Sequence, residues 1–183
     1  SYGKQNATAK LENEDIMSYA HRAAWRLAPE NSLLAIYYSI TMGIDVAEID
    51  LMTTSDGVLV LHHDTTINRC VSGYTGNVSD YTWSKLKTMP LRAEKGGSGA
   101  SVYKITAAQA SILNELPNYK THCGTASSGG NIGIARFDDA LDLLLKHGPG
   151  TMFSLDKVKS DATFAAAYKL LREKNMLGNA IFK

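Results

Sequence analysis

Residues 43–51 read Gly-Ile-Asp-Val-Ala-Glu-Ile-Asp-Leu, and residues 57–64 read Gly-Val-Leu-Val-Leu-His-His-Asp. Each stretch is an apolar run that carries carboxylates or histidines near its end. This pattern is typical of a buried strand that delivers polar side chains to one edge of a parallel sheet. Active sites of α/β proteins form at that edge, so the two stretches predict an α/β enzyme.

The segments around these two stretches extend the pattern. A short strand is expected over 16–21, and Pro29-Glu30-Asn31-Ser32 is expected to open the helix that follows it. Further along, the predicted elements are helices over 80–89, 137–148 and 161–174 and strands over 152–157 and 179–182. Strands that alternate with helices predict a parallel sheet of βαβ units. The five strands are fewer than a closed (β/α)8 barrel needs, so an open sheet or the front part of a barrel is expected.

The 183 residues are predicted to form a single catalytic domain, 1–183. Residues 1–15 form a polar leader. Residues 92–133 hold seven of the fifteen glycines and many serines and threonines, which indicates a Gly/Ser-rich insertion. A loop of that length needs structure of its own, expected around 107–116.

Bulk properties narrow the function classes. A net charge of +1 gives no support for a nucleic-acid surface, and no apolar run is long enough for a transmembrane segment. Cys70 and Cys123 could form one disulfide or none. The polar start at Ser1 favours an extracytoplasmic or secreted protein after leader removal, with a cytoplasmic one as the alternative. An incomplete barrel would expose an apolar sheet edge, from which a homodimer is expected.

Glu48 and Asp50 are separated by one strand residue, so both side chains point to the same face. Two such carboxylates repel each other unless a cation lies between them, and oxygen ligands favour Mg²⁺ or Ca²⁺. Asp156 ends a later strand, where a third metal ligand is expected. A solvated pair of strand-end carboxylates is the alternative.

His21 and His63 each follow an apolar strand and are the candidate catalytic acid/base pair, since histidine titrates near neutral pH. Which of them acts as the acid is not specified. His62 is expected to point to the opposite face from His63. A structural role for either histidine is the alternative.

Arg22 and Lys157 are the candidate phosphate-binding cations, because each adjoins one of these polar strand ends. The alternative is an ordinary charged surface. The spacing of His62, His63, His122 and Cys123 does not fit a zinc site. The sequence also has no dinucleotide-binding loop, P-loop or G-x-S-x-G nucleophile elbow.

Five motifs occur together in this order: His21-Arg22, Pro29-Glu30-Asn31-Ser32, residues 43–50, Thr54-Ser55-Asp56-Gly57 and His63-Asp64-x-Thr66-x-x-Arg69. Together they resemble the glycerophosphodiester phosphodiesterase family. The resemblance implies a TIM-type (β/α)8 barrel, of which about five βα units are visible. It also implies metal-dependent hydrolysis of glycerophosphodiesters, which are small-molecule substrates, to glycerol 3-phosphate and an alcohol.

The chain departs from the family pattern at two places. Ala23 stands where the family usually has glycine, and Val158 stands where it usually has lysine, so Lys157 or Lys159 could substitute. Two alternatives stay open. One is a phospholipase D-like enzyme acting on choline lysolipids or sphingolipids, and the other is a non-catalytic or inactive fragment of the same fold.

Overall fold

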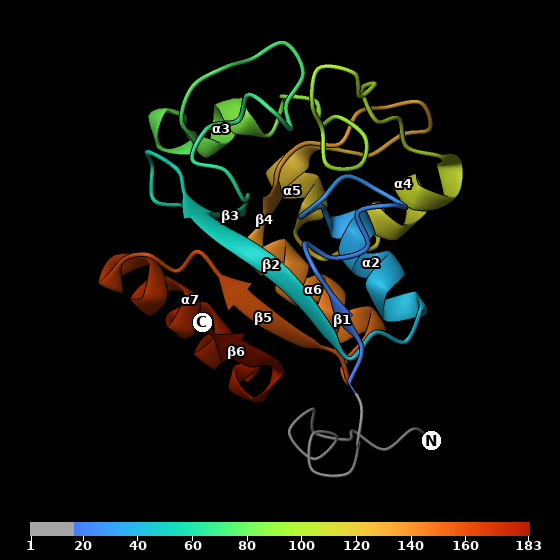
Figure 1. Cartoon of the computed structure of the whole chain (residues 1–183). Helices are drawn as coiled ribbons and strands as arrows, with labels where there is room; N and C mark the ends of the chain where they lie inside the picture. Colours follow the sequence, from blue (N-terminus) through green and yellow to red (C-terminus); the bar gives the residue numbers. More distant parts are fainter. Residues whose placement is uncertain (1–16) are drawn as a thin grey trace.

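The computed structural model describes residues 17–183, and the predicted leader lies outside these described residues. A mixed sheet organises the chain (Figure 1). β2 (Val46–Thr53) lies at its centre and pairs in parallel with β5 (Met152–Asp156) on one side. β5 in turn pairs in parallel with β6 (Ala180–Phe182). β1 (Tyr19–Ala20) pairs in parallel with the first residues of β2. The predicted parallel arrangement is confirmed for these four strands.

The prediction of parallel pairing is wrong for β3 (Leu59–Leu61), which pairs antiparallel with the last residues of β2. The reason is the turn between them, where the Gly57 N–H donates to the Thr54 carbonyl at 3.0 Å and Gly57 has a φ of 82°. A tight turn can join only antiparallel strands, because parallel neighbours need a long crossover. A further strand, β4 (Ala135–Arg136), pairs antiparallel with β3 and was not predicted.

Three crossover helices follow the expected positions: α2 (Leu33–Thr41), α6 (Phe137–His147) and α7 (Asp161–Glu173). α6 contacts both α2 and α7, so the three form one helical layer. The first helix begins later than predicted. Asn31 has a left-handed φ of 56°, and Ser32 is the N-cap whose side chain accepts from the Ala35 N–H.

The insertion contains α4 (Ala107–Asn114), as predicted, and the short α5 (Tyr119–Cys123). The helix predicted over 80–89 is only one turn, α3 (Trp83–Leu86), preceded by the 3-10 turn η1 (Val78–Asp80). A second 3-10 turn, η2 (Leu177–Asn179), precedes β6. Both cysteines are free thiols. No helix among the described residues has the length and apolar character to cross a bilayer.

The two faces of β2 have different surroundings. Ala47, Ile49 and Leu51 belong to the main apolar core, whereas Val46 packs in a separate small cluster with Met152. Side chains alternate along a strand, so Glu48 and Asp50 share the face of Val46. The polar face of the sheet is therefore separated from the helical core.

Candidate active site

Three carboxylates meet on the polar face of the sheet. Glu48 and Asp50 lie on β2, and Asp156 lies beside Asp50 because the two residues are paired in the β2–β5 register. One oxygen from each lies within 4.8 Å of the other two. Glu48 is 2% exposed and Asp50 is fully buried. The structure thus brings together the three predicted metal ligands.

The described residues compensate the charge of this cluster only weakly, since the Lys183 ammonium bonds Tyr19 and its raised pKa depends on Glu48 and Asp156 only as minor causes. Burial and the nearby Asp50 and Asp156 carboxylates raise the pKa of Glu48 above its usual value. The Arg22 backbone N–H donates to Glu48 Oε2 at 2.6 Å, and His21 Nε2 lies 4.0 Å from the same oxygen. Within residues 17–183, no lysine or arginine side chain forms an ion pair with the three carboxylates.

Asn31 positions one of the three carboxylates. Its Nδ2 donates to Asp50 Oδ2 at 2.8 Å, and its Oδ1 accepts from the Asp50 backbone N–H at 3.0 Å. The other oxygen, Asp50 Oδ1, and the neighbouring Ser154 Oγ are buried without a hydrogen-bond partner among the described residues. Asn31 was not predicted as a site residue. The sequence feature that could have identified Asn31 is its residue type, because asparagine tolerates the left-handed backbone that this position adopts.

These features fit a divalent cation. A buried polar atom normally has a partner, and Asp50 Oδ1 lacks one at the point where three anionic side chains converge. An all-oxygen ligand set suits a hard cation such as Mg²⁺ or Ca²⁺. The fit follows from the oxygen donor atoms and from the lack of a lysine or arginine ion pair to these carboxylates among the described residues.

His21 and Arg22 lie directly after β1, next to this cluster. The His21 side chain is 54% exposed. Arg22 Nη1 lies 3.1 Å from Glu30 Oε2, and Arg22 Nε is buried without a partner in the described structure. Arg22 and Ala23 have left-handed φ values of 56° and 59°. These turn the chain so that the Ala23 N–H donates to the Glu48 carbonyl at 3.0 Å.

His62 and His63 lie in the connection after β3 and not in the strand itself. The expected alternation of strand side chains therefore does not apply to them. The antiparallel return of β3 brings this connection back to the site, where the His62 N–H donates to the Asp50 carbonyl at 2.9 Å. The His62 ring is buried, with Nε2 2.9 Å from the Thr66 carbonyl. His63 is partly exposed and bonds Asp64 Oδ1 through Nδ1 at 2.7 Å. None of the described hydrogen bonds or ion pairs joins His63 to His21 or to the carboxylates.

Lys157 lies at the end of β5 and has a left-handed φ of 60°. Its backbone N–H donates to Asp156 Oδ1 at 2.7 Å. Its ammonium group makes no ion pair in the part of the chain that the structure describes. The geometry therefore places the Lys157 backbone, rather than its charge, against the carboxylate cluster.

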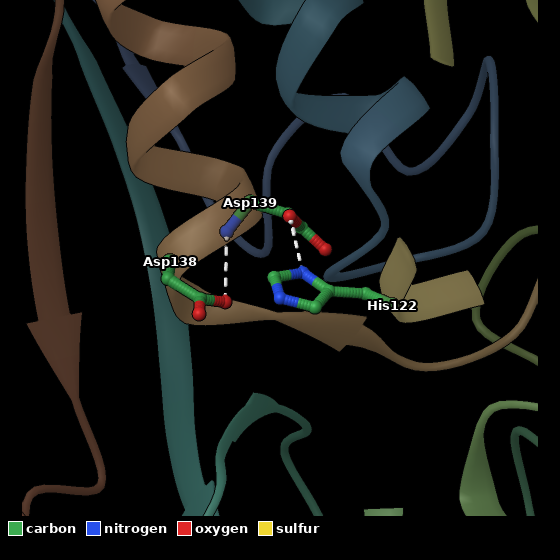
Figure 2. A group of neighbouring side chains, drawn as sticks. All are labelled: His122, Asp138 and Asp139. Atoms are coloured by element: carbon green, nitrogen blue, oxygen red, sulfur yellow. Dashed lines mark hydrogen bonds and ion pairs between the residues drawn. The ribbon is translucent and has the colours of Figure 1, made fainter. Parts of the chain in front are cut away.

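A second group of potential metal ligands lies away from the polar face of the sheet (Figure 2). His122 of α5 meets Asp138 and Asp139 of α6, with His122 Nδ1 2.8 Å from Asp139 Oδ1. Arg136 engages both oxygens of Asp138, through Nε at 2.8 Å and Nη2 at 2.6 Å. Burial opposes ionisation of Asp138, but Arg136 outweighs burial and lowers its pKa. This group contains its own cation, although Asp139 Oδ2 is buried without a hydrogen-bond partner among the described residues, as Asp50 Oδ1 is.

Residues 21–170 match the sequence profile of the glycerophosphoryl diester phosphodiesterase family. Glycerophosphodiester phosphodiesterase 1 of Homo sapiens is 39% identical over 74 residues, which is 40% of this chain and 22% of the human protein. The glycerophosphodiester phosphodiesterase of Bacillus altitudinis is 34% identical over 90 residues, which is 49% of this chain and 34% of that protein. The matched region is about one third or less of either relative.

Solved structures show the same fold at lower identity. The glycerophosphoryl diester phosphodiesterase domain of a Mycobacterium tuberculosis protein superimposes with a TM-score of 0.65 at 22% identity, over 92% of this chain and 52% of that chain. An Oleispira antarctica phosphodiesterase, solved in complex with the product sn-glycerol-3-phosphate, gives a TM-score of 0.58 at 21% identity, over 87% and 53%. The similarity confirms the predicted TIM-type fold class, and this chain spans about half of each structure.

Proposed function

The chain belongs to the glycerophosphoryl diester phosphodiesterase family, and from this membership we propose that it hydrolyses glycerophosphodiesters to glycerol 3-phosphate and an alcohol. One observation carries the proposal. Glu48, Asp50 and Asp156 converge with no lysine or arginine ion pair among the described residues, and the His21 imidazole lies 4.0 Å from Glu48. The Oleispira antarctica relative, with sn-glycerol-3-phosphate as its product, supports the same reaction.

Glu48, Asp50 and Asp156 would hold a divalent cation, Mg²⁺ or Ca²⁺, through one oxygen each. Such an ion would polarise the phosphoryl oxygens and neutralise charge that develops on them. Asn31 would hold Asp50 in place, since its amide bonds both the carboxylate and the backbone of that residue.

Arg22 is proposed to orient the phosphodiester. Among the described hydrogen bonds Glu30 engages only Nη1 of the Arg22 guanidinium, which leaves Nη2 to donate to a non-bridging phosphate oxygen. Lys157 is proposed as a second cation for the same phosphate, with Lys159 as the alternative. The hydrogen bond from the Lys157 backbone N–H to Asp156 Oδ1 places the start of the Lys157 side chain beside the carboxylate cluster.

His21 and His63 are proposed to move the two protons of the reaction. One imidazole takes a proton from the attacking water, or from the glycerol hydroxyl of the substrate. The other donates a proton to the departing alkoxide as the P–O bond breaks. Both rings are partly exposed, with 54% and 25% of their side-chain surfaces accessible, so both can reach a substrate.

The test is release of glycerol 3-phosphate from glycerophosphocholine by the full chain, measured with added Mg²⁺ or Ca²⁺ and again with EDTA. We expect turnover that EDTA removes. His63→Ala should lower kcat by about 10²- to 10⁴-fold. The matched control is His62→Gln, whose amide can still donate to the Thr66 carbonyl and should leave turnover intact.

Absence of cation-dependent turnover by the folded chain would contradict the proposal. Loss of activity in His62→Gln but not in His63→Ala would overturn the choice of histidine. Cleavage of choline lysolipids or sphingolipids without activity on glycerophosphocholine would favour the phospholipase D-like alternative.

A further inference from the structure

The proposed reaction gives no role to Arg69, yet the guanidinium of Arg69 is saturated with hydrogen bonds. Nε and Nη2 donate to the two oxygens of Asp64 at 2.8 and 3.0 Å. Nη2 and Nη1 donate to the two oxygens of Glu30 at 2.7 and 3.0 Å, and Nη1 also donates to the Lys95 carbonyl. A guanidinium has five N–H groups in one plane, and all five of these are used.

One carboxylate held by Arg69 sets the orientation of His63. Arg69 and His63 together hold the pKa of Asp64 far below its usual value, so Asp64 is a carboxylate that can only accept. The bond between His63 Nδ1 and Asp64 Oδ1 at 2.7 Å therefore places the proton of a neutral imidazole on Nδ1. Nε2 is then the nitrogen left to face a substrate, and the ring cannot turn without losing this bond.

The other carboxylate held by Arg69 sets the position of Arg22. Glu30 is buried and accepts from Arg22 Nη1 at 3.1 and 3.4 Å while it accepts from Arg69. The two arginines hold the pKa of Glu30 below its usual value despite burial. Arg22 and Arg69 share the buried Glu30 carboxylate. A shift of Arg69 would therefore change the position of Glu30 and its hydrogen bonds to Arg22.

The start of the insertion closes this network from a third side. The Lys95 carbonyl accepts from Arg69, and the Glu30 N–H donates to the Glu94 carbonyl at 2.9 Å. Gly96 has a φ of 71°, and a Cβ there would lie 2.3 Å from the Arg69 carbonyl oxygen. The backbone of the insertion at Gly96 therefore lies too close to the Arg69 carbonyl for a side chain to fit between them.

We propose that Arg69 is the positioning residue that couples the phosphate-binding Arg22 to the catalytic His63, through Glu30 on one side and Asp64 on the other. This inference rests on the proposed function for the roles of Arg22 and His63. Arg69 would then affect both substrate binding and proton transfer, because its planar guanidinium holds the carboxylates of Glu30 and Asp64.

The test compares Arg69→Lys with Arg136→Lys in the full chain. Arg136 grips Asp138 through Nε and Nη2 as Arg69 grips Asp64, but it lies outside the proposed site. A lysine ammonium is a point charge and cannot bridge two carboxylates in one plane. The measurements are kcat and KM for glycerophosphocholine, and the His63 tautomer from the ¹⁵N shifts of its ring. Asp64→Asn is the second variant, used if Arg69→Lys does not fold.

We expect Arg69→Lys to lower kcat by about tenfold or more and to raise KM, since small misplacements of reacting groups carry penalties of this size. The neutral His63 ring should gain the Nε2-protonated tautomer, because Asp64 is no longer held by Nε and Nη2 of Arg69 and turns away from Nδ1. Asp64→Asn should change the tautomer and kcat but not KM, and Arg136→Lys should change none of them. An unchanged tautomer in both site variants, or equal effects in Arg136→Lys, would overturn the proposal. If the wild-type chain does not turn over the substrate, the proposed function fails, while the tautomer still decides the role of Arg69.

Discussion

Two groups of potential metal ligands can be compared within this chain: Glu48, Asp50 and Asp156 on the sheet, and His122, Asp138 and Asp139 between α5 and α6 (Figure 2). Both offer three side chains whose ligating atoms lie within 4.8 Å of one another. Among the described residues, the first group is bonded by backbone N–H groups and an amide, with the His21 imidazole at 4.0 Å and no lysine or arginine in an ion pair with it. The second includes the guanidinium of Arg136 as a built-in cation.

The number and spacing of ligands do not by themselves define a metal site. Burial raises the pKa of Glu48 and outweighs the opposing effects of the Arg22 backbone N–H and of His21, whereas Arg136 outweighs burial and lowers the pKa of Asp138. A bound cation would relieve repulsion in the first group and would compete with a guanidinium in the second. The lack of a lysine or arginine ion pair among the described residues, rather than ligand count, favours the sheet cluster as the proposed metal site.

The largest expected difference between the groups is in catalysis. Asp50→Asn removes one proposed ligand charge while its side chain can still bond Asn31, and it should lower kcat by about a thousandfold or more, since a catalytic cation contributes several kcal/mol. Asp138→Asn removes one charge from the second group and should leave kcat unchanged. Glycerophosphocholine turnover at a temperature where both variants are folded checks this. Equal losses would contradict the distinction between the groups.

The next difference is in stability without divalent cations. Glu48→Gln should raise the free energy of unfolding in EDTA, because it removes a buried charge from beside two others. Asp138→Asn should lower it by about 1–3 kcal/mol, because it breaks a charged pairing with Arg136. Urea denaturation at neutral pH measures both. Changes of the same sign in the two variants would show that the compensation argument is wrong.

The pH dependence of stability tests the second group by itself. Burial raises the pKa of Asp139 to about 6, so the native carboxyl keeps its proton at pH values where the unfolded chain has lost it. Unfolding between about pH 4 and pH 6 then releases a proton, and the free energy of unfolding falls as the pH rises. Asp139→Asn should flatten this slope relative to wild type in denaturation curves at pH 4.5, 5.5 and 6.5. An unchanged slope would assign the pH dependence to other residues.

The smallest expected effect concerns backbone strain, which accompanies the sheet cluster and not the second one. Arg22, Ala23, Asn31 and Lys157 have left-handed φ values beside the sheet cluster. Ala23→Gly should stabilise the chain by about 0.5–1 kcal/mol, because glycine adopts that conformation without strain. Ala140→Gly in helical α6, next to the second group, should destabilise instead. Thermal denaturation measures both, and destabilisation by Ala23→Gly would refute the strain argument.

Much of the fold follows from local patterns. α6 and α7 are amphipathic segments with clear ends, and they were predicted within one residue of the structure. β3 was placed in the right segment but in the wrong direction, although the Asp56-Gly57 turn between two apolar runs is itself a hairpin signal. β4 is too short to give a periodic pattern.

The site was predictable to the extent that it depends on strand alternation. Glu48 and Asp50 share a face because they are two residues apart, and pairing with β5 brings Asp156 beside them. The Glu30 and Arg69 pairing was not predictable, since these residues are far apart in the sequence and their contact depends on tertiary folding. The same holds for Arg136, which sets the second group apart.

A crystal structure of the full chain grown with Mn²⁺, with data collected for its anomalous signal, would locate the metal site directly. Uncompensated charge predicts an anomalous peak between Glu48, Asp50 and Asp156, and no peak between His122, Asp138 and Asp139. A peak at the second group alone, with the sheet carboxylates free of metal, would contradict the proposed metal site.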